Sequence, residues 1–274
     1  ERLRGEIARF DITDKAGKTV VARTAEVNKK DPKTFPWWNT THGNIETVVK
    51  PWTPVTYKGG TLGVWGREMK LGAAGLFSSV KTQGTELLAA PMELVAETAD
   101  GKTVKATGGK PSLSFDKDFR KTAQIESTMG DFAVSSTGSL EFDGLYKLTM
   151  TITPKKATTV KSLKLVIPYT TGAGQYIHAV ADEIRSGFFY GYVPQGTGRV
   201  WDSPILGSGA MTVGSFVPYV WIGCPTGGLC FMADSDEGWV PNKDVPAMEI
   251  RRDTEGRIDF VLNLISQEFT VDTP

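Results

Sequence analysis

Apolar and polar residues alternate along much of this chain. In the clearest run, residues 146–153, an aromatic or aliphatic residue occupies every even position and lysine or threonine every odd position. Residues 163–167 repeat the pattern with Leu163, Leu165 and Ile167. A period of two is typical of strands that bury one face in an antiparallel sheet. Both segments are therefore predicted to be half-buried β-strands.

Many further short segments have strand-like composition and are separated by turns that contain glycine. The 30 glycines of the chain supply the positive φ angles that tight turns require. A hairpin is predicted for residues 3–12 and 18–24, around Asp14-Lys15-Ala16-Gly17. A helical period appears only at residues 179–185, for barely two turns. Further strands are predicted for residues 62–71, 75–82, 92–98, 103–106, 124–128, 131–136, 188–192, 199–202, 216–222, 229–233, 248–251 and 257–263.

This pattern predicts an all-β fold, namely a large antiparallel two-sheet β-sandwich with little helix. No repeat of fixed period is present, which argues against a propeller. Residues 1–274 are predicted to form a single β-sandwich domain, because no polar linker divides them. Within it, residues 28–54 contain four prolines and three tryptophans and are predicted to be a long Pro/Trp-rich loop. The alternative is a small amino-terminal lobe over residues 1–54.

The charge balance bounds the partners. The 274 residues include 31 Lys+Arg and 31 Asp+Glu, so the formal net charge is 31 − 31 = 0. A neutral chain argues against a nucleic-acid groove or an anionic membrane surface, since both attract an excess of cations. No apolar run reaches the roughly 18 residues of a membrane span. The chain begins at Glu1 with no signal-like stretch, and we expect a processed or excised piece of a longer protein.

Few residues are suited to catalysis. His42 and His178 are the only histidines, and no Gly-x-Ser-x-Gly nucleophile motif accompanies them. Each histidine is expected to satisfy its own hydrogen bonds rather than act as a general base. No cofactor or metal site is predicted, because common zinc and phosphate-loop spacings are missing and residues 234–238 fit an acidic turn better than a calcium loop. A glycosidase-type carboxylate pair could be drawn only from acids that neighbour aromatic residues, which are Asp202, Asp234, Asp236 and Glu237.

The two cysteines, Cys224 and Cys230, flank a Pro-Thr-Gly-Gly segment. If Gly227-Gly228 closes a hairpin, their side chains lie about one position out of register. We therefore expect two free thiols, with a disulfide as the alternative, and the redox compartment stays open.

The seven tryptophans are the most suggestive feature. A flat indole can stack on the apolar C–H face of a sugar ring while its N–H reaches a polar neighbour. Trp65 and Trp221 lie inside strand-like runs and are expected to fill the space between sheets. The candidate ligand contacts lie in predicted loops or at strand ends, and they are Trp37, Trp38, Trp201 and Trp239.

Three blocks of sequence, taken together, resemble a known family. The first is Phe35-Pro36-Trp37-Trp38-Asn39 with Gly43 and Pro51-Trp52-Thr53-Pro54-Val55. The second is Val64-Trp65-Gly66-Arg67-Glu68 with Gly75-Leu76, Gly84-Thr85-Glu86-Leu87-Leu88-Ala89 and Pro91. The third is Phe216-Val217-Pro218-Tyr219-Val220-Trp221-Ile222-Gly223 with Gly228-Leu229-Cys230-Phe231, Ala233-Asp234-Ser235-Asp236 and Gly238-Trp239. Their order and spacing resemble the β-sandwich region that precedes the catalytic barrel in proteins related to glycoside hydrolase family 123, the β-N-acetylgalactosaminidases.

The resemblance implies a supersandwich like that of galactose mutarotase, as a non-catalytic accessory domain of a larger carbohydrate-active protein. It implies a downstream (β/α)₈ barrel as partner, carbohydrate as a further partner, and a periplasmic or secreted location. In that family an adjacent Asp-Glu pair on the barrel performs catalysis, so no catalytic residue is assigned here. Cys224-Pro225 departs from the acidic or amide residues that relatives tend to have in this hairpin, so no ligand contact is assigned to it.

Two alternatives remain at the level of sequence. A self-sufficient sugar isomerase or lyase on a mutarotase-like fold would need His178 or His42 and a carboxylate in one cleft. A free-standing glycan-binding module would instead depend on exposed tryptophans such as Trp37 and Trp201.

Overall fold

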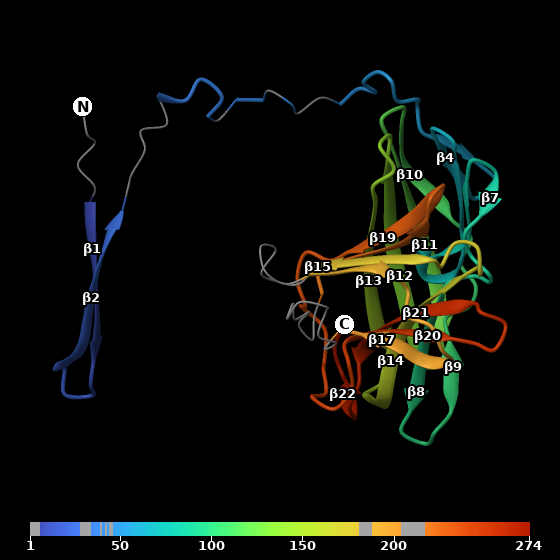
Figure 1. Ribbon diagram of the computed structural model, residues 1–274. Helices are drawn as coiled ribbons and strands as arrows, with labels where there is room; N and C mark the ends of the chain where they lie inside the picture. Colours follow the sequence, from blue (N-terminus) through green and yellow to red (C-terminus); the bar gives the residue numbers. More distant parts are fainter. Residues whose placement is uncertain are drawn as a thin grey trace. The chain divides into compact units, whose positions relative to one another are not determined.

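The computed structural model describes residues 6–27, 34–38, 40, 41, 43, 46–180, 188–203 and 217–274. By its internal contacts the chain forms two compact units, Glu1–Glu46 and Thr47–Pro274, shown in Figure 1. The described residues contain no α-helix, and the 3₁₀ turn η2 spans Ala73–Gly75. No helix in this part of the chain is long and apolar enough to cross a membrane. The all-β prediction is confirmed.

The first unit contains one hairpin, formed by β1 (Glu6–Thr13) and β2 (Thr19–Val27). Its turn is closed by the Asp14 carboxylate, whose Oδ1 accepts hydrogen bonds from the main-chain N–H groups of Ala16 and Lys18, both at 2.9 Å. Gly17 adopts a φ of 80°, which a residue with a side chain rarely adopts. The hairpin predicted from the sequence is therefore confirmed.

The described part of the second unit contains four antiparallel sheets. The five-stranded sheet has the order β3 (Thr56–Lys58), β4 (Thr61–Val64), β5 (Arg67–Leu71), β6 (Phe77–Thr82) and β7 (Thr85–Glu86). One four-stranded sheet has the order β10 (Ser112–Lys117), β11 (Arg120–Met129), β12 (Phe132–Glu141) and β13 (Tyr146–Pro154). The other has the order β16 (Phe188–Tyr192), β15 (Tyr176–Val180), β18 (Tyr219–Cys224) and β19 (Gly227–Met232).

The seven-stranded sheet joins segments from distant parts of the chain. Its order is β17 (Gly198–Asp202), β20 (Met248–Arg252), β21 (Ile258–Ile265), β14 (Thr158–Tyr169), β8 (Glu93–Thr98) and β9 (Thr103–Lys105), and β22 (Phe269–Val271) also pairs with β14. Two sheets were expected from sequence, and the structure is more divided than that. The reason is that short neighbouring strands, such as β3–β4–β5 and β18–β19, hydrogen-bond to one another and belong to separate sheets.

The alternation of apolar and polar residues in the sequence corresponds to strands whose side chains point alternately toward the core and toward solvent. Along β11 and β12, every second residue is buried, including Ile125, Val134 and Leu140, and the residues that alternate with them are exposed or half-buried. Two apolar clusters form the core of the unit. One extends from the five-stranded sheet to Ile222 and Phe260, and the other joins Met129, Phe132 and Val134 to the seven-stranded sheet.

Segment 62–71, predicted as one strand, is a hairpin. β4 ends at Val64, β5 begins at Arg67, and the two residues between them form the turn. Gly66 has a φ of 71°, which suits the tight two-residue connection of a hairpin. Trp65 therefore lies at the tip, 49% exposed. The expectation that it fills the space between sheets is wrong.

The prediction of a short helix at residues 179–185 is also wrong for the residues that the structure describes. Ala179 and Val180 belong to β15, which pairs with β16 on one side and β18 on the other. Ile177 and Ala179 are buried and His178 is exposed, which is the alternation of a strand. Residues 181–187 lie outside the described residues.

Candidate functional site

Two of the predicted contact tryptophans lie in the first unit and are accessible. Trp37 is 63% exposed and Trp38 is 44% exposed. Both pack beside Phe35, with ring centroids 5.1 Å and 6.2 Å from it, and the two indoles are 5.9 Å apart. The three rings form a small aromatic cluster that leaves much of both indoles open to solvent.

The other two predicted tryptophans lie in the second unit and are less accessible. Trp201, on β17, is 0% exposed and packs 6.3 Å from Phe189, between ring centroids. Its indole N–H has no hydrogen-bond partner among the described residues. Trp239 is half-buried against the core. Trp201 is thus a packing residue in this structure, and three of the four candidates have surface available for a ligand.

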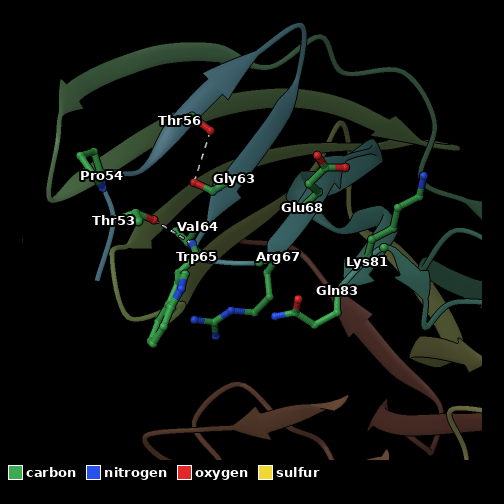
Figure 2. Close-up of a pocket in the computed structure, with 12 residues that line it drawn as sticks. Thr53, Pro54, Thr56, Gly63, Val64, Trp65, Arg67, Glu68, Lys81 and Gln83 are labelled. Atoms are coloured by element: carbon green, nitrogen blue, oxygen red, sulfur yellow. Dashed lines mark hydrogen bonds between the residues drawn. The ribbon is translucent and has the colours of Figure 1, made fainter. Parts of the chain in front are cut away.

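The structure places an exposed cleft of about 510 Å³ beside Trp65, at the end of the five-stranded sheet. Figure 2 shows the Trp65 indole at one side of the cleft, with Arg67 and Gln83 to its right and Thr53 above it. The Thr53 hydroxyl oxygen accepts a hydrogen bond from the main-chain N–H of Trp65 at 3.1 Å. This contact ties the hairpin tip to the segment that precedes the sheet.

The polar side chains of this cleft are held in place by neighbours. The Arg67 guanidinium lies 5.9 Å from the ring centroid of Trp52 and donates to the Asp143 carbonyl oxygen at 2.9 Å. Trp52 in turn meets Trp65 edge-on, with centroids 5.3 Å apart. Packing of this kind restricts the rotamers of both the cation and the indole.

The chemistry that the cleft offers is mixed. Glu68 and Lys81 face each other in register across β5 and β6, and Gln83 adds an amide. An exposed ring with donors and acceptors beside it can contact a small polar group. Sequence reasoning missed this cleft, and the signal that could have located it is the Trp65-Gly66 pair, which marks a turn rather than a strand.

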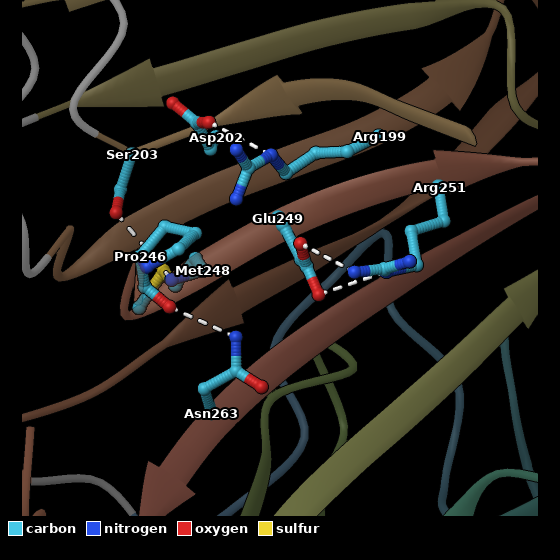
Figure 3. Close-up of polar contacts among 8 residues, drawn as sticks. All are labelled: Arg199, Asp202, Ser203, Pro246, Met248, Glu249, Arg251 and Asn263. Atoms are coloured by element: carbon cyan, nitrogen blue, oxygen red, sulfur yellow. Dashed lines mark hydrogen bonds and ion pairs between the residues drawn. The ribbon is translucent and has the colours of Figure 1, made fainter. Parts of the chain in front are cut away.

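A carboxylate pair does occur at the edge of the seven-stranded sheet. Asp202 on β17 lies opposite Glu249 on β20. Each has an arginine partner, since Arg199 is 3.2 Å from Asp202 and Arg251 forms a two-point contact with Glu249 at 2.9 and 3.3 Å (Figure 3). Glu249 is only 3% exposed. This arrangement is typical of structural ion pairs, because each carboxylate is paired with an arginine.

A buried amide lies close to these ion pairs in the sheet. Asn263 donates from Nδ2 to the carbonyl oxygen of Pro246 at 2.8 Å, and Ser203 accepts from the N–H of Met248 at 3.4 Å (Figure 3). These contacts hold the chain before β20 onto β21. They connect Trp201 and Asp202 to the rest of the sheet rather than to a pocket.

The remaining candidate acids and His178 lie on other elements than β17 and β20. Asp234, Asp236 and Glu237 are exposed on the turn after β19. His178 packs edge-on against Tyr219, with ring centroids 5.7 Å apart, and faces Tyr190 and Trp221 in register. His42 lies outside the described residues. Within the described part of the chain, no group of three His, Cys, Asp or Glu side chains could hold a metal ion.

The cysteines are free thiols, as expected. Their hairpin differs from the expectation, because Pro225-Thr226 forms the turn and Gly227 already pairs with Cys224. Cys230 pairs with Trp221, so the two thiols are three ladder positions apart rather than one. A hydrogen bond with the Thr226 hydroxyl lowers the pKa of Cys224. Cys230 is exposed as a residue, but desolvation of its thiol by neighbouring side chains raises the pKa of Cys230.

The geometry defines an all-β domain of antiparallel sheets, with tryptophans at its accessible surfaces. Comparison with models of protein families matches residues 55–232 to the model described as glycoside hydrolase 123, third domain. The match spans more than half of the chain, and the chain belongs to this family. The resemblance found in the sequence is confirmed, and the description implies other domains in the full protein.

Proposed function

We propose that this chain is a non-catalytic accessory β-sandwich domain of a family 123 glycoside hydrolase, and that it packs on the catalytic (β/α)₈ barrel of the same polypeptide. The observation that carries the proposal is the match of residues 55–232 to a third domain, since such a domain works beside others. The carboxylates Asp202 and Glu249 support a structural role, because each contacts an arginine.

The hairpin of the first unit supports packing against another domain. Phe10 and Ile12, two residues apart on β1, are 62% and 64% exposed, and Val21 lies opposite Ile12 on β2. A two-stranded hairpin is marginally stable by itself in water. Burial of this apolar face under another body would stabilise it, and large exposed apolar patches are typical of interaction sites.

The test of the accessory role is hydrolysis of an aryl N-acetylgalactosaminide by this chain alone and by the parent protein. We expect release of the aryl group by the parent and none above the buffer rate by the chain. Turnover by the chain alone would overturn the proposal and favour the alternative of a self-sufficient enzyme.

The test of barrel packing is amide hydrogen exchange. Amides of β1 and β2 are expected to exchange more slowly in the parent than in the isolated chain, because docking suppresses opening of the hairpin. The amides of β11 and β12, which already lie within a sheet core, serve as the internal control. Equal exchange of the hairpin in both proteins would argue against packing through this face.

The finer fold is also part of the proposal. The seven-stranded sheet and the sheet β10–β13, which share an apolar cluster, are the candidates for the two main layers of a mutarotase-like supersandwich. Superposition of an experimental structure on galactose mutarotase tests this, and a different strand order in the aligned sheets would exclude it.

Glycan contact through loop tryptophans completes the proposed role. Trp37 and Trp38 have the largest accessible indoles of the four predicted contacts, and Trp239 offers part of its ring. Trp37→Ala is expected to weaken binding in a glycan titration. Trp201→Ala is not informative for contact, because the side chain is buried. Unchanged binding in Trp37→Ala and Trp38→Ala would remove this part of the proposal.

A further inference from the structure

The sheet β16–β15–β18–β19 has one buried face and one accessible face. On the buried face, Ile177 and Ile222 are 1% and 0% exposed. Alternate residues of a strand point to opposite faces, so the neighbours of these residues share the other face. Its ring-bearing residues, referred to below as the aromatic face, are Tyr176, His178, Tyr190, Tyr192, Tyr219 and Trp221.

The strand register brings these rings side by side. His178 lies opposite Tyr190 on one neighbouring strand and opposite Trp221 on the other. Tyr176 lies opposite Tyr192, and their ring centroids are 4.9 Å apart. Tyr190 and Tyr192 are 65% and 69% exposed. The face therefore presents a continuous row of rings to solvent across three strands, β16, β15 and β18.

Two glycines allow the indole of Trp221 to lie flat along this sheet. Gly223 and Gly228 face each other across β18 and β19, beside Trp221 on the same face. A Cβ atom on Gly228 would lie 2.8 Å from Cε2 of the indole, and one on Gly223 would lie 2.8 Å from Cη2. One side of the indole is thus in contact with glycine backbone, and the half-buried ring keeps its other side toward solvent.

The aromatic face carries no permanent charge. Its other positions on the described strands are Val180, Phe188, Gly223, Gly228, Cys230 and Met232, so no Asp, Glu, Lys or Arg lies among the face positions of these strands. Phenol hydroxyls and an imidazole supply the hydrogen-bonding groups. A neutral ligand loses less hydration on such a face than a charged one, which would find no counter-ion.

We infer that the aromatic face binds a neutral oligosaccharide chain, whose pyranose rings stack on Trp221 and on the exposed tyrosines. A sugar ring has an apolar C–H face for the rings and hydroxyls for the phenols and His178. Tyr176 and Tyr192 hydrogen-bond to each other, and because a phenol hydroxyl can both donate and accept, the pair can still bond to sugar hydroxyls. This inference deepens the proposed role in a carbohydrate-active protein and rests on it for the class of ligand.

The binding test is calorimetric titration of the chain with chitohexaose, cellohexaose and xylohexaose, with hexagalacturonate as the charged counterpart. At least one of the neutral chains is expected to bind, and hexagalacturonate at least about tenfold more weakly than that chain. No binding of any neutral chain at millimolar concentration, or preference for hexagalacturonate, would overturn the inference.

Variants test whether the oligosaccharide binds on the aromatic face. Trp221→Ala and the double variant Tyr190→Ala/Tyr192→Ala are each expected to raise the Kd about tenfold or more, as loss of one or two stacking partners does. The double variant removes only exposed rings and keeps the test valid if Trp221→Ala unfolds. Phe269→Ala is the matched control, because it removes an exposed ring from another sheet and is expected to leave Kd unchanged. Loss of binding in Trp65→Ala alone would assign the site to the cleft instead and overturn the inference.

Alkylation of Cys230 separates a glycan surface from a docking surface. Cys230 is exposed on the aromatic face, and Cys224→Ser leaves it as the only thiol of this chain, so its alkylation is followed on its own peptide. The bound neutral oligosaccharide is expected to slow alkylation in both the chain and the parent protein. Protection of Cys230 in the parent without sugar would show that another domain covers the face and would overturn the inference. The hydrolysis assay judges the accessory role independently of either result.

Discussion

Substitution of Gly223 by alanine tests whether the flat indole is a built feature of the sheet. The new Cβ would overlap Cζ2 of Trp221 and lie 2.7 Å from the carbonyl oxygen of Gly227. The indole can move away from the sheet, but the backbone oxygen is fixed by the hairpin. The variant therefore strains the hairpin and tilts the ring that is proposed to stack on sugar.

The magnitude follows from two opposing effects. Overpacking by a methyl group in a close-packed site costs about 1–3 kcal/mol. Alanine in place of glycine within a strand returns about 0.5–1 kcal/mol. The net loss in the free energy of unfolding is expected to be about 1.5 kcal/mol, which for a unit of this size lowers Tm by about 3–6 °C.

The assay is urea unfolding followed by tryptophan fluorescence, with calorimetry for Tm. Gly172→Ala is the matched control, because nothing lies within 4 Å of a Cβ at that position. It is expected to be neutral or to stabilise by about 0.4–1 kcal/mol. In a Trp221→Ala background the cost of Gly223→Ala should fall, since only the Gly227 contact remains. Equal stability of Gly223→Ala and Gly172→Ala would refute the reasoning.

Two further predictions concern buried and reactive side chains. Trp201→Ala should lower the free energy of unfolding by about 3–5 kcal/mol because it leaves a large cavity, and a loss below about 1 kcal/mol in urea unfolding would contradict its burial. At pH 8 iodoacetamide should alkylate Cys224 faster than Cys230, because a lowered pKa leaves more thiolate and a raised one leaves less. Thr226→Val should slow alkylation of Cys224, since it removes the hydrogen bond that lowers the pKa of this thiol. Faster alkylation of Cys230 than of Cys224 in the unmodified chain would contradict the prediction.

The tryptophans show how poorly a local sequence pattern predicts the burial of a single side chain. Trp65 lies in an apolar run and was expected inside the fold, yet the glycine after it makes a turn and exposes it. Trp201 follows a glycine-rich turn and was expected at the surface, yet it lies opposite Ile250 and is buried. Its partner is far away in sequence, so no local pattern could reveal the burial.

The aromatic face shows the same limit. In the sequence, Tyr190 and Tyr192 are two residues apart, and so are Tyr219 and Trp221, so each pair can be assigned to one face of its strand. Their union on one face depends on β15 pairing with both β16 and β18. Because a shift of one residue in either register would turn the rings of that strand to the opposite face, the face exists only through tertiary pairing.

The sequence by itself determined that this protein is all-β, where most strands run, that Asp14 begins a hairpin turn, and which family it belongs to. These properties follow from alternation, turn residues and ordered motifs, all of which are local. The tertiary structure alone decided which tryptophans are buried, that Asp202 lies opposite Glu249, and which rings share a face. Those outcomes depend on contacts between strands that are distant in the chain, whose pairing is selected by the burial of the whole core.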